Sequence, residues 1–138
     1  MPLLARRFFC AALVAEADER RDVAFSQLLS AAWACDDSGA EEQARICRDR
    51  AAEMLAAAME GGDVPASNPV GHVVLADVLR RAGRFEEAMA ACAVAESGLL
   101  SEDGEESRTA AVIAFIRALA EAADDDVHVV AEAFAGER

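Results

Sequence analysis

The residues of this chain that could do chemistry are few and lie far apart. His72 and His128 belong to different helical segments, and neither has a cysteine or serine near it in a recognised nucleophile context. Glu86 and Glu87 stand where a helix is expected to begin, so the helix dipole explains them better than an acid/base pair. No HExxH, GxSxG or Gly-rich phosphate loop is present. The sequence therefore predicts no catalytic residues and a protein that is not an enzyme.

Metal and cofactor chemistry is not indicated either. The four cysteines form no CxxC pair and have no histidine at ligand spacing: Cys10, Cys35, Cys47 and Cys92. The run Asp124–Asp126 lacks the spread of oxygens that a calcium loop needs, so it predicts a turn that supplies a helix N-cap. We expect no metal, no cofactor and buried free thiols, which indicate a reducing, cytoplasmic location, while the even cysteine count leaves two disulfides open.

Composition sets the class of fold and narrows the class of partner. About a quarter of the 138 residues are Ala, only 5% are aromatic and 54% are hydrophobic, which favours an all-α protein with one core. Twenty-six acidic residues against thirteen basic ones, all of them Arg, give a net charge of -13. Such a field repels phosphate backbones and anionic lipids, so we expect no nucleic-acid or membrane partner. The residues from Arg6 to Ala15 only loosely imitate an export signal, because the apolar run is short and Glu16 is awkward beside a cleavage site.

Helix-breaking Gly and Pro residues and acidic clusters divide the chain into about seven expected helices in a single all-helical domain, 1–138. An N-terminal capping helix lies in 1–22, and its broad apolar face suits a buried position. Helix pairs follow in 23–60, 69–100 and 105–136, with Gly61–Pro69 as the one composition-based linker. The expected helices are Leu3–Ala17, Asp22 (as N-cap) to about Cys35, Ala40–Met59, Val70–Ala82, Phe85–Leu99, Arg108–Ala122 and Val127–Phe134.

The clearest pattern runs from Leu75 to Ala88 and on to Ala95. Small residues at Ala76, Ala88 and Ala95 allow two antiparallel helices to approach closely, Gly83 supplies a left-handed helix end, and Phe85 fills the turn. This segment resembles the tetratricopeptide repeat, which implies a solenoid of antiparallel helix pairs. The alternative is a nonrepeating helical bundle.

A weaker copy of the pattern precedes it, with Gly39 in the place of Gly83. Ala32, Ala44 and Ala51 then correspond to the three small positions. The copy departs from the pattern in two places, since Glu41 replaces Phe85 and Arg48 replaces Cys92. The pair in 105–136 has suitable helix lengths but no turn glycine.

The resemblance implies that the first helix of each pair lines a groove that binds a partner. Carried onto this sequence, the groove positions are Ser26, Leu29, Trp33, Val70, Val73, Asp77, Arg80 and Ile116. Trp33 is a candidate anchor, although a core position is an equally open interpretation, and Asp77 with Arg80 is equally read as a solvated pair. A Lys-free chain lacks the clamp with which this family grips acidic C-termini. The sequence thus predicts a protein-interaction module, a small chaperone or scaffold, for a basic or amphipathic peptide or helix.

A second hypothesis is structural. The apolar face of the first helix, with Phe8 and Phe9, would pair with its copy in a homodimer that has no peptide groove. Phenylalanines buried within the chain and an open groove at Trp33 would favour the interaction module.

Overall fold

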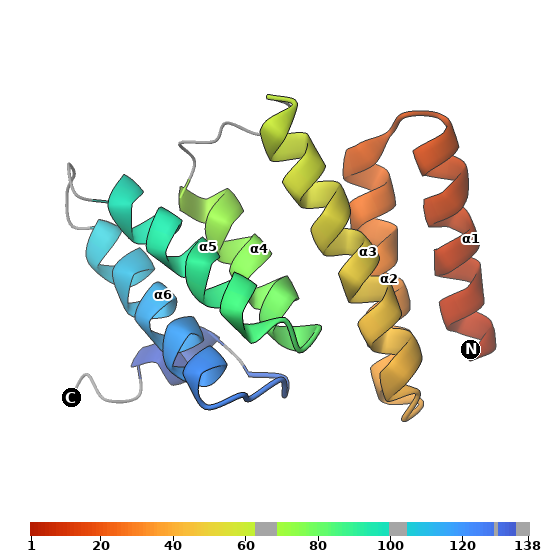
Figure 1. Ribbon diagram of the computed structural model, residues 1–138. Coiled ribbons are helices and arrows are strands. Elements are labelled where there is room, and N and C mark those ends of the chain that lie inside the picture. The colour runs from red at the N-terminus through yellow and green to blue at the C-terminus, as the bar shows by residue number, and fades with distance from the viewer. Residues whose placement is uncertain (63–68, 100–104, 129, 135–138) are drawn as a thin grey trace. The chain divides into compact units, whose positions relative to one another are not determined.

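The structure is a computed structural model that describes residues 1–62, 69–99, 105–128 and 130–134. Over these residues the chain is all-α, with six α-helices and one short 3-10 helix (Figure 1). The elements are α1 (Leu3–Ala17), α2 (Arg21–Asp37), α3 (Glu41–Glu60), α4 (Pro69–Arg81), α5 (Phe85–Gly98), α6 (Glu105–Glu121) and η1 (Val130–Phe134). Each expected helix is present, but the last is a 3-10 turn that begins three residues later than predicted.

The chain divides into two compact units, which we call unit 1 (Met1–Asp63) and unit 2 (Val64–Arg138). Their boundary falls within the predicted linker Gly61–Pro69. Most of that linker, residues 63–68, and most of the predicted loop Ser101–Ser107 lie outside the described residues. Unit 1 contains α1 to α3, and unit 2 contains α4 to α6 with η1.

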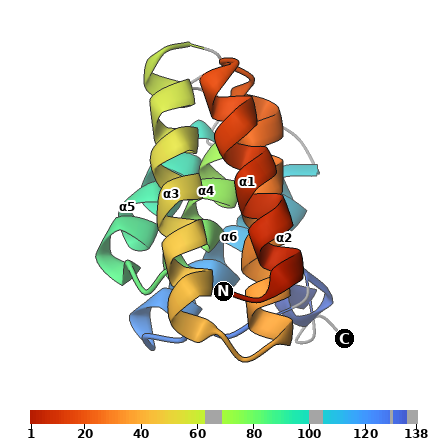
Figure 2. The same ribbon diagram turned by 90° about the vertical axis from the view of Figure 1, so that its right-hand side faces the viewer.

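In unit 1 the three helices pack in sequence, α1 against α2 and α2 against α3, with alternating direction (Figure 2). Small side chains form most of the core, which lets the helix axes approach closely. Phe8 and Phe9 of α1 are half-buried against the cluster of Ala31, Ala32 and Cys47. α1 therefore packs over the cluster that α2 and α3 form.

In unit 2, α4 packs against α5, α5 against α6, and α6 also contacts α4 and η1. The seam between α4 and α5 is made of the predicted small residues, because Ala76, Ala88 and Ala95 have no exposed surface. The corresponding alanines of unit 1, Ala32, Ala44 and Ala51, are equally buried between α2 and α3. The two helix pairs are thus alike at the positions where their sequences correspond.

A residue with a left-handed backbone lies two residues after the end of five helices, α1 to α4 and α6; these residues are Glu19, Gly39, Gly62, Gly83 and Ala123, with φ between 53° and 81°. After Glu19, Gly39, Gly83 and Ala123, the N–H of the next residue donates to the carbonyl five residues earlier, at 2.8–2.9 Å. This is the Schellman type of helix end, which normally takes glycine. α6 therefore ends like α2 and α4 although its turn has no glycine, and Ala123 accepts the conformational strain instead.

The predicted N-cap of the second helix is wrong. α2 begins at Arg21, one residue before Asp22, and its N-cap position is Arg20, which makes no side-chain capping bond. The turn from Glu19 leads directly into the helix, so Asp22 lies in the first helical turn, where an acid is still favourable to the helix dipole.

Candidate partner-binding surfaces

Trp33 lies on the surface of unit 1. Its side chain on α2 is 58% exposed, so the interpretation of Trp33 as a core residue is wrong. Leu29, one turn earlier, is half-buried, and Ser26 is exposed. Asp36, one turn later, is held by Arg48 of α3, a buried guanidinium that contacts both carboxylate oxygens. The exposed indole therefore stands beside an ion pair that fixes α2 to α3.

That ion pair explains how unit 1 tolerates a charged side chain at a buried position. Arg48 occupies the position of the buried, apolar Cys92 in unit 2. A buried guanidinium needs a partner, and Asp36 supplies one across the helix pair. The charge that Arg48 brings to this buried position is thus neutralised by Asp36 within unit 1.

Arg80 is neither a groove residue nor half of a solvated pair, because it is only 1% exposed. Its Nε and Nη2 donate to Oδ1 of Asp77, at 3.1 and 2.8 Å. Its Nη1 donates to the carbonyls of Asp124 and Asp126, both at 2.8 Å. Arg80 therefore fastens α4 to the turn after α6. Ile116 is 6% exposed and belongs to the core of unit 2, so it offers almost no surface to a partner.

The acidic run after α6 is a turn, as predicted, but the prediction that it supplies an N-cap is wrong, because η1 begins only at Val130. Arg81 donates from Nε to the carbonyl of Asp125 at 2.9 Å, so the two adjacent arginines hold all three carbonyls of the run. The N–H of Asp126 donates to Oδ1 of Asp124 at 2.9 Å. This backbone bond, with a further hydrogen bond from His128, lowers the pKa of Asp124.

His128 continues this network toward η1. Its Nδ1 lies 3.2 Å from Oε1 of Glu132 in η1, and its Nε2 lies 3.0 Å from Oδ2 of Asp124. The ring packs edge-on against Phe115 of α6, with centroids 5.8 Å apart. The two carboxylates, Glu132 foremost, raise the pKa of His128 because they favour the imidazolium. His128 thus links the turn after α6 to η1.

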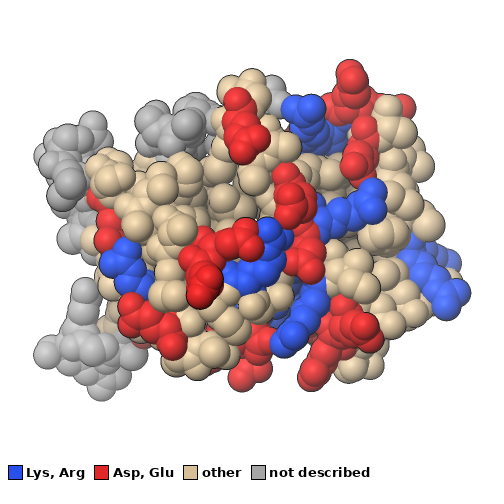
Figure 3. Space-filling model, viewed as in Figure 1, with Lys and Arg blue, Asp and Glu red and all other residues tan. Residues whose placement is uncertain are grey.

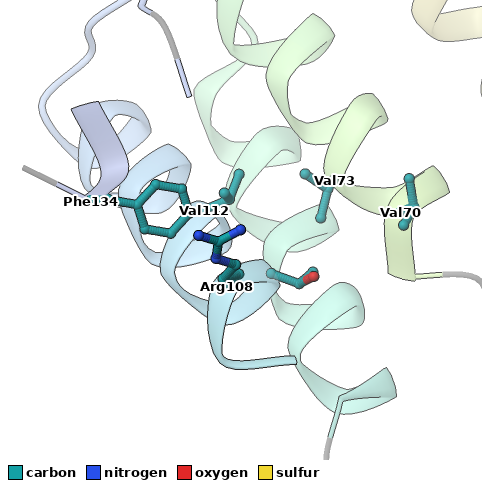
Figure 4. Close-up of a pocket in the computed structure, with 6 residues that line it drawn as sticks. Val70, Val73, Arg108, Val112 and Phe134 are labelled. Carbon is teal, nitrogen blue, oxygen red and sulfur yellow. The ribbon is translucent and has the colours of Figure 1, made fainter. Parts of the chain in front are cut away.

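An apolar cavity of about 300 Å³ opens beside this network in unit 2 (Figure 4). It is lined by Val70 and Val73 of α4, Arg108, Thr109 and Val112 of α6, and Phe134 of η1. The guanidinium of Arg108 lies over the ring of Phe134, 5.7 Å from its centroid, in a cation–π contact. Apolar carbon forms nearly all of the lining, so the cavity suits an apolar group.

Sequence reasoning found only part of this cavity. Val70 and Val73 were among the expected groove positions, and both line it. Val112 and Arg108 share one face of α6 at a spacing of four residues, but that spacing does not distinguish a cavity wall from a core face. Phe134 was missed because its place depends on how η1 folds back onto α6.

The cysteines are all free thiols, so the alternative of two disulfides is wrong. Burial raises the pKa of Cys47 to about 11 and that of Cys92 to about 11, and it also raises the pKa of Cys35. Cys10 is exposed on α1, contrary to the expectation that all four would be buried.

Among the described residues, no three His, Cys, Asp or Glu side chains gather closely enough to hold a metal ion. Over the same residues, none of the helices combines the length and the apolarity that crossing a membrane requires. Comparison of the chain with protein-family models, with curated proteins and with solved structures finds no match.

Proposed function

We propose that this chain is a tetratricopeptide-like solenoid of helix pairs that acts as a noncatalytic, cytoplasmic protein-interaction module, a small chaperone or scaffold. In this proposal the cavity of unit 2 receives an apolar side chain from a peptide or helix of the partner. The observation that carries the proposal is the apolar cavity between α4 and α6, bordered by Val73 and Phe134.

The recurrence of structure at a spacing of 44 residues supports the repeat. Gly39 and Gly83 share the same helix end, and the small seam residues are buried in both pairs. By this correspondence we infer that α2 and α4 are the first helices of successive pairs, and α6, which ends in the same kind of turn, would begin a third. The resemblance implies that first helices line the binding groove, and the cavity lies between two of them.

The position of Trp33 fits the same scheme. Trp33 corresponds to Asp77 of the second pair, and both side chains are about half exposed. Leu29 and Ser26 correspond to Val73 and Val70, which line the cavity. Trp33 is therefore proposed as a separate candidate contact on unit 1, argued independently of the cavity in unit 2.

We infer the kind of group that would enter the cavity from its size. A volume of about 300 Å³ accommodates one large apolar side chain, such as Leu, Met or Phe. Burial of one such side chain contributes about 1.5–3 kcal/mol, which alone corresponds to binding weaker than millimolar. The partner must therefore add further contacts. The net charge of -13 favours basic residues in the partner outside the cavity.

The charged side chains on the visible surface are consistent with this partner class. Among the residues coloured in Figure 3, acidic and basic side chains alternate over the visible face and form no extended basic surface. A nucleic acid needs such a surface, since its affinity comes mainly from phosphate neutralisation. A basic or amphipathic peptide remains the better fit.

The test is selection of binders from a displayed random peptide library, followed by titration of a selected peptide against variants of the full chain. Val73→Asn and Val112→Asn place an amide in the cavity, and we expect each to weaken binding at least tenfold. Val94→Asn is the matched control, because Val94 is an exposed valine on α5 away from the cavity. Trp33→Ala tests the candidate contact on unit 1.

The proposal fails if the library yields no binder, or if selected peptides bind the cavity variants as tightly as the wild type. Circular dichroism of each variant establishes that the helices are intact, so a loss of binding is not confused with unfolding.

A further inference from the structure

The side of α1 that faces away from α2 is apolar but uncovered. The inward side contains Ala5, Ala12 and Ala15, which are buried. The opposite side, which we call the outer face of α1, presents Leu3, Cys10 and Val14 along one line, with Arg7 and Leu13 beside them. Leu3 is 69% exposed and Val14 is 62% exposed. Figure 2 shows α1 at the front of unit 1, with α2 behind it.

The charges on the outer face are divided along its length. Arg6 and Arg7 are exposed in its first half, which contains no acid. Asp18, also exposed, follows directly after its last residue, Ala17. At 3.6 residues per turn, Arg7 and Asp18 fall on the same side of the line through Leu3, Cys10 and Val14.

We propose that two copies of this chain pair through the outer face of α1, with the two α1 helices antiparallel and crossing at Cys10. Cys10 is the midpoint of α1, seven residues from Leu3 and seven from Ala17. A twofold axis through the crossing point therefore sets the first half of one helix beside the second half of the other. Both copies use the same surface, so the assembly stops at a dimer.

The arginines in the first half of α1 and the acid at its end favour the antiparallel arrangement over a parallel one. A twofold axis perpendicular to the helices keeps Arg7 of one copy and Asp18 of the other on the same side of the contact. Their Cα atoms differ by about 7.5 Å along the axis, at a rise of about 1.5 Å per residue, and an extended arginine side chain spans that offset. A parallel pair would instead place each Arg7 level with the other Arg7 and each Asp18 level with the other Asp18, so opposite charges would not meet.

The side chain at the crossing also suits a close contact. Cys10 is small, so the helix axes can approach to the short end of the usual range of about 8–10 Å. The larger Leu3 and Val14 lie on either side of the crossing point along the helix, where the two helices are further apart. This surface is separate from the cavity in unit 2, so the dimer does not depend on the proposed peptide site.

A lipid surface is the other occupant that an exposed apolar face suits, and the charge disfavours it. The chain has a net charge of -13, and anionic headgroups repel it. Only two arginines adjoin the outer face, whereas membrane-surface helices have many basic residues on their polar side.

The first experiment is sedimentation velocity of the full chain over a concentration series up to about 200 μM, since a contact of one helix face is small and the dimer weak. We expect the wild type to dimerise. Val14→Glu and, as a second variant, Leu3→Glu should raise the dimer Kd at least tenfold. The matched control is Val94→Glu, an exposed valine on α5, which should leave the Kd unchanged.

The charge pair gives a test of orientation. Arg7→Asp and Asp18→Arg should each weaken the dimer, and the double variant should restore it because the pair is reversed. Failure of the double variant to recover the wild-type Kd would overturn the antiparallel arrangement.

Cross-linking gives an independent test. Under diamide, which oxidises two thiols to a disulfide, Cys10 should join two copies, and Cys10→Ser should abolish the product. In a Cys10→Ser background, Leu3→Cys should not cross-link to itself, because the two positions lie about 21 Å apart along antiparallel helices. Adding Ala17→Cys should restore the product.

A protein that stays monomeric over the whole series overturns the proposal, as does self-cross-linking of the Leu3→Cys variant, which indicates parallel helices. Binding of a monomer to vesicles of phosphatidylcholine and phosphatidylglycerol in equal parts, lost in Val14→Glu, would assign the outer face to lipid instead.

Discussion

Arg80 provides the sharpest test of how unit 2 is held together. Replacement by Met removes the guanidinium but retains most of the apolar stem, so the packing along α4 changes little. Two carbonyls, those of Asp124 and Asp126, then lose a charged donor at 2.8 Å. The side chain of Asp77 is half exposed and regains water. The loss therefore comes mainly from the two carbonyls.

The magnitude follows from those two bonds. A hydrogen bond to a charged group contributes about 1.5–3 kcal/mol, so Arg80→Met should lower the free energy of unfolding by about 3–5 kcal/mol. With a urea slope of about 2 kcal/mol per molar, the unfolding midpoint of unit 2 falls by about 2 M. Far-UV circular dichroism follows the transition, and hydrogen exchange read by mass spectrometry assigns it to α4 and the turn after α6.

Arg117→Met is the matched control. Arg117 of α6 also joins two helices of unit 2, with Nη1 2.8 Å from Oε1 of Glu96 on α5, but both side chains are about a third exposed. An exposed ion pair contributes at most about 1 kcal/mol. If Arg80→Met costs no more than Arg117→Met, the reasoning that the buried guanidinium fastens α4 to the turn is refuted.

Four further outcomes are expected. His128→Gln should destabilise the protein more at about pH 5.5 than at about pH 8.5. The pKa of His128 is raised in the folded protein, so its protonated ring stabilises the fold fully below the unfolded pKa of 6.5, and this stabilisation is lost as pH rises through the folded pKa. Equal losses of stability in urea unfolding at both pH values would contradict this. Ala123→Gly should stabilise the protein by about 1 kcal/mol in thermal unfolding by relieving the left-handed helix end, whereas Ala118→Gly, at an exposed position within α6, should destabilise it by a similar amount. Ellman's reagent at pH 8 should titrate Cys10 alone in the native protein and all four thiols in denaturant. Burial keeps Cys47 and Cys92 protonated, with pKa values of about 11. Rapid reaction of a second thiol in the native protein would contradict the burial of the other three cysteines. Acrylamide should quench the fluorescence of Trp33 readily, with a red-shifted maximum, and a blue-shifted, protected spectrum would mean that the indole is covered.

The sequence predicted best what depends on neighbours in the chain. Helix positions follow from apolar spacing and from the turn residues, and Gly39 and Gly83 end their helices as expected. The small seam residues also follow from a local pattern, since close helix packing requires Ala or a residue of similar size. The all-α class and the pairing of successive helices needed no information from distant parts of the chain.

The errors concern residues whose surroundings are set by distant segments. Arg80 was taken for a surface residue, but its carbonyl acceptors lie 44 and 46 residues further along the chain. No periodicity shows that such a turn will fold back over α4. Cys10 was expected to be buried because it lies in an apolar stretch of α1, yet a helix at the end of a packed series is covered on one side only. Phe134 was missed for the same reason as Arg80.

These distant contacts connect the folding of unit 2 with its proposed binding site. Phe134 forms one wall of the cavity, and it belongs to η1, which has no long helix of its own to position it. η1 is placed by His128 through Glu132, and His128 contacts Asp124, whose carbonyl Arg80 holds. Arg80 was predicted as a groove contact, and in the structure it contributes only indirectly to the cavity, by positioning the turn that leads to Phe134. A variant of Arg80 should therefore weaken peptide binding through the loss of the Phe134 wall, even though the side chain itself never reaches the cavity.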